Sequence, residues 1–218
     1  MSTSTSDAVQ RLNSLLPLKL RQAELPPELL NLHRATLTSL ANRGRPPDRE
    51  ELHELLAGGD VDAALTRLAS DDLVVLNAAR NAIAGAYPMT TEMTPHQLTV
   101  NKQPVNAMCA LDALSVGPMF DAEVEISSNC HVTGTALSIR MQGESLLEVT
   151  PSADVHVGVR WQNPSACAAH SLCLELVFLR DRSIALEWQA DDRENTSLFN
   201  LQDAIVFGAG FFTPLLQD

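Results

Sequence analysis

Met108-Cys109-Ala110-Leu111-Asp112-Ala113-Leu114 is the stretch around which the rest of this sequence can be interpreted. It places a thiol and a carboxylate three residues apart at the start of an apolar, helix-forming run. Positions three apart are neighbours on one helix face, so Cys109 and Asp112 can converge on one ligand. A cysteine near a helix N-terminus also feels the positive end of the helix dipole, which favours the thiolate. The alternative is a buried core cysteine beside a solvated aspartate, because free cysteine is commonly buried.

A second cysteine, Cys173, lies in an apolar run, Ser171–Leu179, that predicts a strand. Alternation with period two places Cys173 on the face opposite the leucines of this strand. It can then meet Cys109 in a cleft between helix and strand. Two thiolates and one carboxylate would form a site that selects soft metals. The alternative is that Cys173 is a small core hydrophobe.

The composition excludes several classes of function. The formal net charge is -12 and the pI is about 4.8, which argues against nucleic-acid binding and against an anionic membrane surface. The most apolar run, Ile205–Leu216, is too short to span a membrane and contains two glycines and a proline. The first seven residues lack the pattern of a secretory leader. We therefore expect a cytoplasmic protein.

Thiols in the cytoplasm are normally reduced, so the four cysteines are expected to be ligands, nucleophiles or core residues. No Cys-x-x-Cys pair is present, which argues against a zinc ribbon and a thioredoxin-type motif. A structural zinc site is conceivable but has the wrong spacing for a known ribbon or finger. Its ligands would be Cys130, His131, Cys167 and His170.

The N-terminal part of the chain is predicted to be helical. We expect a disordered tail over residues 1–6 and then four helices and a strand. The helices are Asp7–Leu18, one opened by Pro26-Pro27 and ended by Gly44, one capped by Asp48 with Glu51 in capping-box position, and one capped by Asp60; the strand is Leu73–Leu76. Helices followed by a short β element are the pattern of a winged helix.

The charge of this region argues against DNA binding. Between Arg45 and Asp72 there are three basic and eight acidic residues, a local net charge of −5. A surface that reads DNA would be basic. The sequence therefore predicts a structural domain. We expect a tail and short helix over residues 1–24, a winged-helix-like domain over 25–85 and a catalytic domain over 86–218.

The second half of the sequence is predicted to be rich in strands. The helix from Cys109 should be interrupted at Gly117-Pro118. The expected strands are Gln97–Val100, Ala122–Ser127, Thr135–Met141 and Val155–Trp161, with a helix over Ile184–Arg193 and a final apolar element over Leu201–Phe212. Helices first and strands later, without a βαβ rhythm, predict an α+β fold.

Together these motifs resemble the organomercurial (alkylmercury) lyase family in order and spacing. The resemblance covers residues from Gly85 onward and more loosely the helical region before it. The residues that carry it are Met108–Leu114, Ser128-Asn129-Cys130, Thr133-Gly134, Ser171-Leu172-Cys173 and Val206-Phe207-Gly208-Ala209-Gly210. Many members have an aromatic residue in place of Met108.

The resemblance implies protonolysis of a carbon–mercury bond to a hydrocarbon and Hg(II). By this analogy Cys109 and Cys173 bind mercury, Asp112 handles the proton, and Cys130 is structural. The implied fold joins an N-terminal winged-helix-like domain to a catalytic domain of small antiparallel sheets. Cys167, six residues before Cys173, is an alternative second ligand, a hand-off thiol or a bystander.

An unperturbed aspartate would be a poor proton donor, because only about one in a thousand is protonated at pH 7. Asp112 must therefore lie in an apolar pocket that raises its pKa, or collect the proton that a cysteine loses on binding mercury. We favour the second, because the helical spacing of Cys109 and Asp112 allows direct transfer.

No resident cofactor is expected, and excess cellular thiol would be the co-reactant. The expected partners are small organomercurials and a mercuric reductase that accepts Hg(II), without nucleic acid or membrane, and the protein would be a monomer or dimer. The alternative function is a non-catalytic binder of soft metals, mercury or copper, on the same scaffold.

Overall fold

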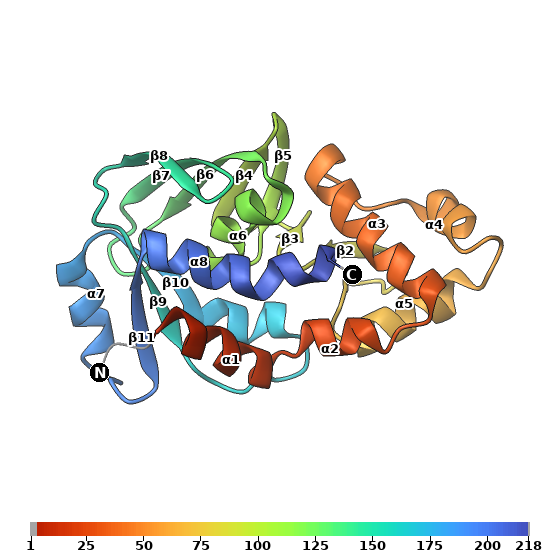
Figure 1. Ribbon diagram of the computed structural model, residues 1–218, viewed down its shortest axis with the longest axis horizontal. Helices are drawn as coiled ribbons and strands as arrows, with labels where there is room; N and C mark the ends of the chain where they lie inside the picture. The colour runs from red at the N-terminus through yellow and green to blue at the C-terminus, as the bar shows by residue number, and fades with distance from the viewer. Residues whose placement is uncertain (1–3, 218) are drawn as a thin grey trace.

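Two antiparallel sheets form the β-structure of the protein (Figure 1). The computed structural model describes residues 4–217. The larger sheet has the strand order β1-β2-β3-β5-β4-β6-β7-β8 and the smaller one β10-β9-β11. The strands are β1 (Val75–Leu76), β2 (Ile83–Ala86), β3 (Met89–Thr90), β4 (His96–Val100), β5 (Gln103–Ala107), β6 (Glu123–Asn129), β7 (Ala136–Gln142), β8 (Ser145–Thr150), β9 (His156–Arg160), β10 (Leu176–Leu179) and β11 (Thr196–Asn200). The predicted α+β class is confirmed.

Eight α-helices and three 3-10 helices surround these sheets within residues 4–217. They are α1 (Thr5–Leu15), α2 (Leu18–Ala23), α3 (Pro27–Arg43), α4 (Arg49–Leu55), α5 (Val61–Ser70), α6 (Ala110–Phe120), η1 (Ala168–His170), η2 (Leu172–Glu175), α7 (Arg182–Gln189), α8 (Leu201–Phe212) and η3 (Thr213–Leu216). None of the helices in the described part is long and apolar enough to cross a membrane.

The helix boundaries in the first half follow the capping signals of the sequence. Gly44 ends α3 with a φ of 66°, and a Cβ there would clash with the carbonyl oxygen of Pro104. Asp48 and Glu51 form the expected capping box of α4, and Asp60 caps α5. The winged-helix interpretation of this region and the domain boundaries at 24 and 85 stay predictions.

The predicted N-terminal tail is wrong for residues 4–6. Ser4 caps α1 by accepting a hydrogen bond from the Asp7 backbone, so the helix starts at Thr5. It ends at Leu15 rather than Leu18, and Pro17 precedes the separate helix α2. Residues 1–3 of the expected tail lie outside the described part of the chain.

The predicted interruption of the helix at Gly117-Pro118 is also wrong. Helix α6 continues to Phe120, and the Asp121 backbone closes its last turn by donating to the Gly117 carbonyl. A proline inside a helix removes one backbone hydrogen bond, the one that its own N–H would donate to the carbonyl four residues earlier. The helix can continue past it where packing compensates for that loss. Met119, beyond the proline, is buried.

Helix α6 lies in the interior and positions the site. It contacts strands of the larger sheet on one side and α8 on another. Gly208 allows the close approach of α8, because a Cβ there would clash with the Ser115 hydroxyl of α6. Helix α1 packs on α8, so α8 lies between α1 and α6 (Figure 1).

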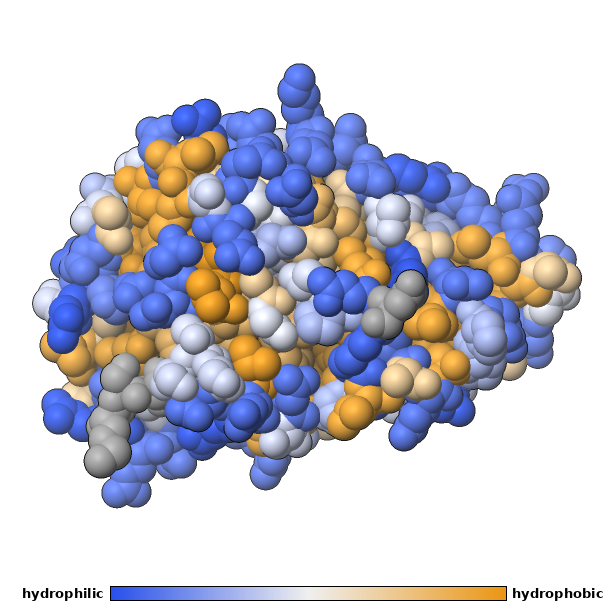
Figure 2. Space-filling model, viewed as in Figure 1, coloured by the Kyte–Doolittle hydropathy of each residue, from blue (hydrophilic) through white to orange (hydrophobic). Residues whose placement is uncertain are grey.

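One hydrophobic cluster extends from Ala8 to Leu215 and includes helices of the first half and strands of the second. As predicted, the alternating residues Val155, Val157, Val159 and Trp161 are buried. The surface is mixed: on the face in Figure 2, hydrophobic residues lie among hydrophilic ones, most continuously near β7 and β8.

Candidate functional site

Cys109, Asp112 and Cys173 come together inside the protein. One ligand atom from each lies within 4.8 Å of those of the other two, and all three residues are buried. Within residues 4–217 this is the one group of three or more His, Cys, Asp or Glu residues that could hold a metal ion. The four residues considered for zinc form no such group there. Two sulfurs this close can share one large metal ion.

Cys109 is held by the start of α6. Its backbone is extended, and its sulfur accepts a hydrogen bond of 3.3 Å from the Asp112 backbone N–H, so the thiol serves as the N-cap of the helix. Burial raises the pKa of the Cys109 thiol to about 11, although hydrogen bonds from Cys173 and the Asp112 backbone oppose the shift. The unliganded Cys109 is therefore a thiol at neutral pH.

Asp112 is a buried carboxyl group with an incomplete set of partners. It is 1% exposed, and its Oδ2 has no hydrogen-bond partner among the described residues. Burial raises the pKa of Asp112 to about 7, and hydrogen bonds from Cys109 and Cys173 oppose the shift. Burial therefore makes the protonated form of Asp112 accessible near neutral pH, unlike that of an exposed aspartate. Proton delivery was expected to need either an apolar pocket that raises the pKa of Asp112 or a proton collected from a cysteine. The structure contains the apolar pocket.

Cys173 reaches the same point from a segment that is not the predicted strand. The 3-10 helix η2 covers Leu172–Glu175, and the strand β10 starts only at Leu176. Period-two alternation therefore fails: Leu172 is 1% exposed, whereas Leu174 is 62% exposed. Hydrogen bonding to Cys109, burial and the charge of Asp112 raise the pKa of Cys173 well above its usual value.

The cavity beside these groups is small and enclosed. Its volume is about 10 Å³, near the lower limit for one water molecule. Apart from the three polar groups, apolar side chains of α1, α6, η2 and α8 line it. These are Leu12, Leu16, Leu111, Leu172, Phe211 and Phe212, with Leu176 and Tyr87 completing the wall.

Met108 does not line this cavity. It lines a neighbouring surface pocket of about 200 Å³, together with Met93 and Leu174. The side chain of Met108 is nonetheless 93% buried, as its exposed fraction is 7%. Met108 therefore borders the surface pocket rather than the cavity beside Cys109.

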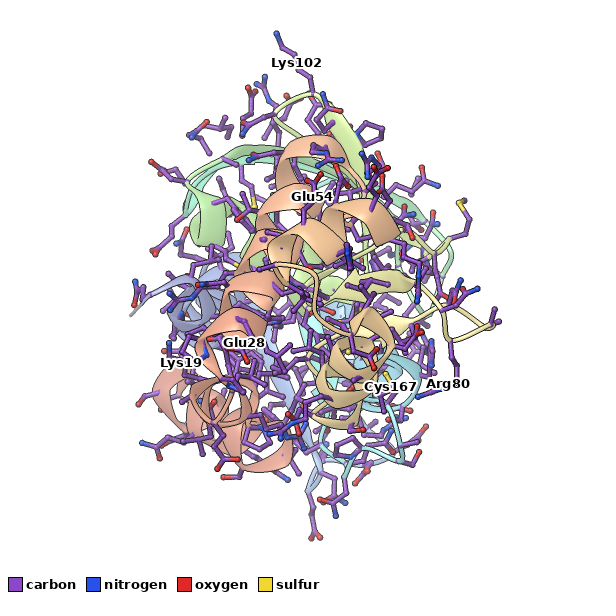
Figure 3. All side chains as sticks on the ribbon, turned by 90° about the vertical axis from the view of Figure 1, so that its right-hand side faces the viewer. Lys19, Glu28, Glu54, Arg80, Lys102 and Cys167 are labelled. Atoms are coloured by element: carbon purple, nitrogen blue, oxygen red, sulfur yellow. The ribbon has the colours of Figure 1, made fainter. Side chains whose placement is uncertain are left out.

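The other two cysteines lie outside the cluster. Cys130 accepts a hydrogen bond of 3.4 Å from the Arg180 backbone N–H, which ties the turn after β6 to the end of β10. Cys167 is half-buried and lies 3.4 Å from the hydroxyl of Tyr87. Figure 3 labels it on the segment that lies beside α5. The geometry thus favours Cys173 over Cys167 as the second sulfur.

Sequence reasoning missed Tyr87 and Asp72. Tyr87 is the only tyrosine of the chain, lines the cavity and is 1% exposed. Asp72 belongs to no recognisable sequence motif, yet it accepts hydrogen bonds from Tyr87 and from the Ala168 backbone. The one signal in the sequence was the single tyrosine before a proline, Tyr87-Pro88, but it did not indicate that Tyr87 would hydrogen-bond to Asp72.

Comparison with known proteins identifies the family. A family model described as alkylmercury lyase matches residues 89–213. The chain belongs to the alkylmercury lyase family. The matched residues contain Cys109, Asp112 and Cys173, as the resemblance required.

Several alkylmercury lyases are similar over part or most of the chain. The protein from Staphylococcus epidermidis is 28% identical over 122 residues, 56% of each chain, and that from Bacillus cereus is 28% identical over 120 residues, 55% of this chain and 54% of the other. This alkylmercury lyase homologue thus spans just over half the length of these relatives. The Pseudomonas putida protein is 26% identical over 193 residues, 88% of each chain.

A solved structure shares the fold. The mercury-bound form of MerB2 superimposes with a TM-score of 0.76 at 22% identity, covering 94% of this chain and 99% of that one. The fold of this lyase-family member is therefore that of MerB2.

Proposed function

We propose that this protein cleaves carbon–mercury bonds by protonolysis, giving a hydrocarbon and Hg(II). The observation that carries the proposal is the buried set of Cys109, Asp112 and Cys173, with its ligand atoms within 4.8 Å of one another. Membership of the alkylmercury lyase family supports the same activity. Sulfur is the ligand that mercury prefers, and the carbon left behind needs a proton.

The first step is thiol exchange at Cys109. An organomercury thiolate, R–Hg–SR′, transfers R–Hg to the Cys109 sulfur, and the departing thiolate leaves as R′SH with the cysteine's proton. We assign the first exchange to Cys109 because its sulfur already accepts a hydrogen bond from the Asp112 backbone N–H. Its place at the helix N-terminus favours the thiolate that forms during exchange.

The second step brings Cys173 onto mercury. Cys173 transfers its proton to the ionised Asp112 carboxylate and forms the second mercury–sulfur bond. Mercury then carries two sulfurs and the carbon, so electron density on the carbon rises. The hydrogen bond between Cys173 and Asp112 gives this proton a direct path to the carboxylate.

The third step breaks the carbon–mercury bond. Protonated Asp112 donates its proton to the carbon, the hydrocarbon R–H leaves, and mercury stays bound to the two cysteines. The Asp112 carboxylate is regenerated. Its pKa of about 7 suits this alternation, because both protonation states are accessible near neutral pH. Two external thiols then remove Hg(II) and return both protons to the cysteines.

The test is turnover with a defined substrate. Phenylmercury or methylmercury is incubated with the protein and excess thiol, and benzene or methane is measured by gas chromatography. We expect several equivalents of hydrocarbon per protein. Stoichiometric mercury binding without hydrocarbon would contradict the proposal.

The cavity itself supports a second candidate function. A volume of about 10 Å³ does not accommodate an organic group beside mercury unless the wall moves, whereas two sulfurs this close fit a bare ion. A non-catalytic binder of mercury or copper would have this geometry. Binding of Hg(II) or Cu(I) with no hydrocarbon from either organomercurial would favour it.

We also propose the setting in which the reaction takes place. The residue 25–85 region would be a winged-helix-like domain without DNA contacts, since its acidic surface repels phosphate. The protein would work in the cytoplasm and pass Hg(II) to thiols or to a mercuric reductase. A gel shift at low salt tests the first statement, and mercury transfer to a purified reductase tests the second.

A further inference from the structure

A hydrogen-bonded network holds the segment that precedes Cys173. The Tyr87 hydroxyl donates to Asp72 Oδ1 over 2.9 Å and accepts from the Ala169 backbone N–H over 2.8 Å. Asp72 Oδ2 accepts from the Ala168 backbone N–H over 3.0 Å. Tyr87 is 1% exposed and Asp72 8% exposed. One pair of adjacent backbone amides therefore donates to Asp72 Oδ2 and to the Tyr87 hydroxyl, while Asp72 Oδ1 accepts from that hydroxyl.

The partners come from distant parts of the chain. Asp72 follows α5 in the left-handed region, with a φ of 53°, a conformation that aspartate tolerates better than most residues. Tyr87 follows β2, and the two amides belong to η1. The network thus ties the helical first half of the protein to the segment that carries Cys173.

The segment has little regular structure of its own. Backbone hydrogen bonds at the ends of its 3-10 helices join His170 to Cys167, Ser171 to Ala168 and Leu174 to Ser171, at 3.1–3.2 Å. These lie at the long end of the normal range. Short 3-10 helices have poorer hydrogen-bond geometry than α-helices, so contacts from outside determine where this segment lies.

We propose that Tyr87 and Asp72 are positioning residues that hold Cys173 in place for the second mercury–sulfur bond. The inference rests on the proposed function and assigns a separate step to each of the two cysteines. Cys109 is held by α6 and captures R–Hg without help from the network. Cys173 must then reach the same mercury, and a displacement of about 1 Å at a reacting group can slow a step ~100-fold.

The test is the variant Tyr87→Phe, which removes one donor and one acceptor and keeps the ring in the cavity wall. We expect kcat for benzene release from phenylmercury to fall ~10–100-fold, with KM changed less than about threefold, because capture by Cys109 is intact. Intact-mass spectrometry should show a protein adduct that retains the phenylmercury group. In the wild type we expect mercury without phenyl.

The adduct separates positioning from a loss of stability. Ser197→Ala is the matched control, since it removes the buried hydrogen bond of 2.8 Å from the Trp161 indole and lies outside the cavity wall. We expect it to lower the unfolding temperature without accumulating the phenylmercury adduct. Tyr87→Phe with wild-type kcat and no adduct would overturn the inference.

Two further measurements keep the test decisive. If Tyr87→Phe does not fold, Asp72→Asn replaces it, because its amide cannot accept from both Tyr87 and Ala168 in the same way; wild-type behaviour of that variant would overturn the inference.

If the wild type releases no hydrocarbon, the proposed function fails, but the network is still tested with Hg(II) alone. The wild type should then lose two titratable thiols on binding one Hg(II), and Tyr87→Phe should lose one; loss of two by the variant would overturn the inference.

Discussion

The two cysteines of the buried cluster with Asp112 are brought to one point by different means. Cys109 caps α6, an eleven-residue helix whose residues are nearly all buried. Cys173 lies on a 3-10 helix of four residues whose neighbours are fixed by Asp72 and Tyr87. A helix terminus keeps its geometry because many local hydrogen bonds cooperate, whereas an irregular segment depends on a few distant ones. In the proposed reaction, this difference corresponds to two separate steps, capture of mercury at Cys109 and formation of the second mercury–sulfur bond at Cys173.

The largest expected effect comes from Cys109→Ser. Serine is a good N-cap, so α6 should remain intact and the unfolding temperature should change little. Hydrocarbon release should fall by about 10³-fold or more, because the first mercury–sulfur bond cannot form.

Cys173→Ser is the counterpart of that variant. It should abolish hydrocarbon release to a similar degree but still form the organomercury adduct, which intact-mass spectrometry detects. An adduct on Cys109→Ser and none on Cys173→Ser would reverse the assigned order of the two sulfurs.

Asp112→Asn tests the proton without disturbing either sulfur. The amide keeps the size of the carboxyl group but cannot deliver a proton, so we expect release to fall ~10²–10⁴-fold while the organomercurial still binds. Binding is measured by mass spectrometry and release by gas chromatography. Full turnover by this variant would eliminate the proposed role of Asp112.

The next largest effect is on the free energy of unfolding and comes from Asp112, the buried carboxyl group beside both cysteines. The folded-state pKa of Asp112, about 7, lies above the value of about 4 expected in the unfolded chain. The unfolded chain therefore loses its proton first, and the free energy of unfolding should fall as the pH rises from about 4 to above 7. Between pH 5.5 and pH 8 the loss should be about 2 kcal/mol.

Urea denaturation at these two pH values measures the loss, with Asp112→Asn as the control that lacks this ionisation. The difference between the two proteins isolates the contribution of Asp112 from those of other titrating groups. Equal pH dependence in both proteins would show that Asp112 is not the group responsible.

The smallest expected effect comes from Cys167→Ser. A hydroxyl can still hydrogen-bond to Tyr87, and Cys167 lies outside the cavity wall, so hydrocarbon release should change less than about twofold. Loss of activity on the scale of Cys173→Ser would make Cys167 the second sulfur or an obligatory carrier.

Local signals in the sequence were sufficient for one half of the site. The spacing of Cys109 and Asp112 predicted that their side chains converge, although Cys109 caps α6 instead of lying on its face. The caps at Gly44, Asp48 and Asp60 marked the helix ends because capping depends on neighbouring residues. Alternation predicted β6 and β7 within a few residues, since each buries one face, and it also predicted β9, whose three central residues are all buried.

The other half depends on contacts that no local pattern contains. The apolar run around Cys173 predicted a strand, but the backbone N–H groups just before it donate hydrogen bonds to Asp72 and Tyr87, and the chain there forms 3-10 turns. The continuation of α6 past Pro118 likewise depends on packing rather than propensity. Strand β8 was missed because its residues are mostly exposed and give no alternation of buried positions.

The enclosing wall of the cavity affects how the protein matures during synthesis. Leu12 of α1 and Leu16, which follows that helix, leave the ribosome before Phe211 and Phe212 of α8, which come after nearly all the rest of the described chain. Contacts between segments this far apart in sequence form slowly compared with local helices. Cys109 and Cys173 are therefore both added to the chain before Phe211 and Phe212 complete the cavity wall. The nascent chain thus passes through a period in which its thiols depend on the reducing power of their surroundings rather than on burial.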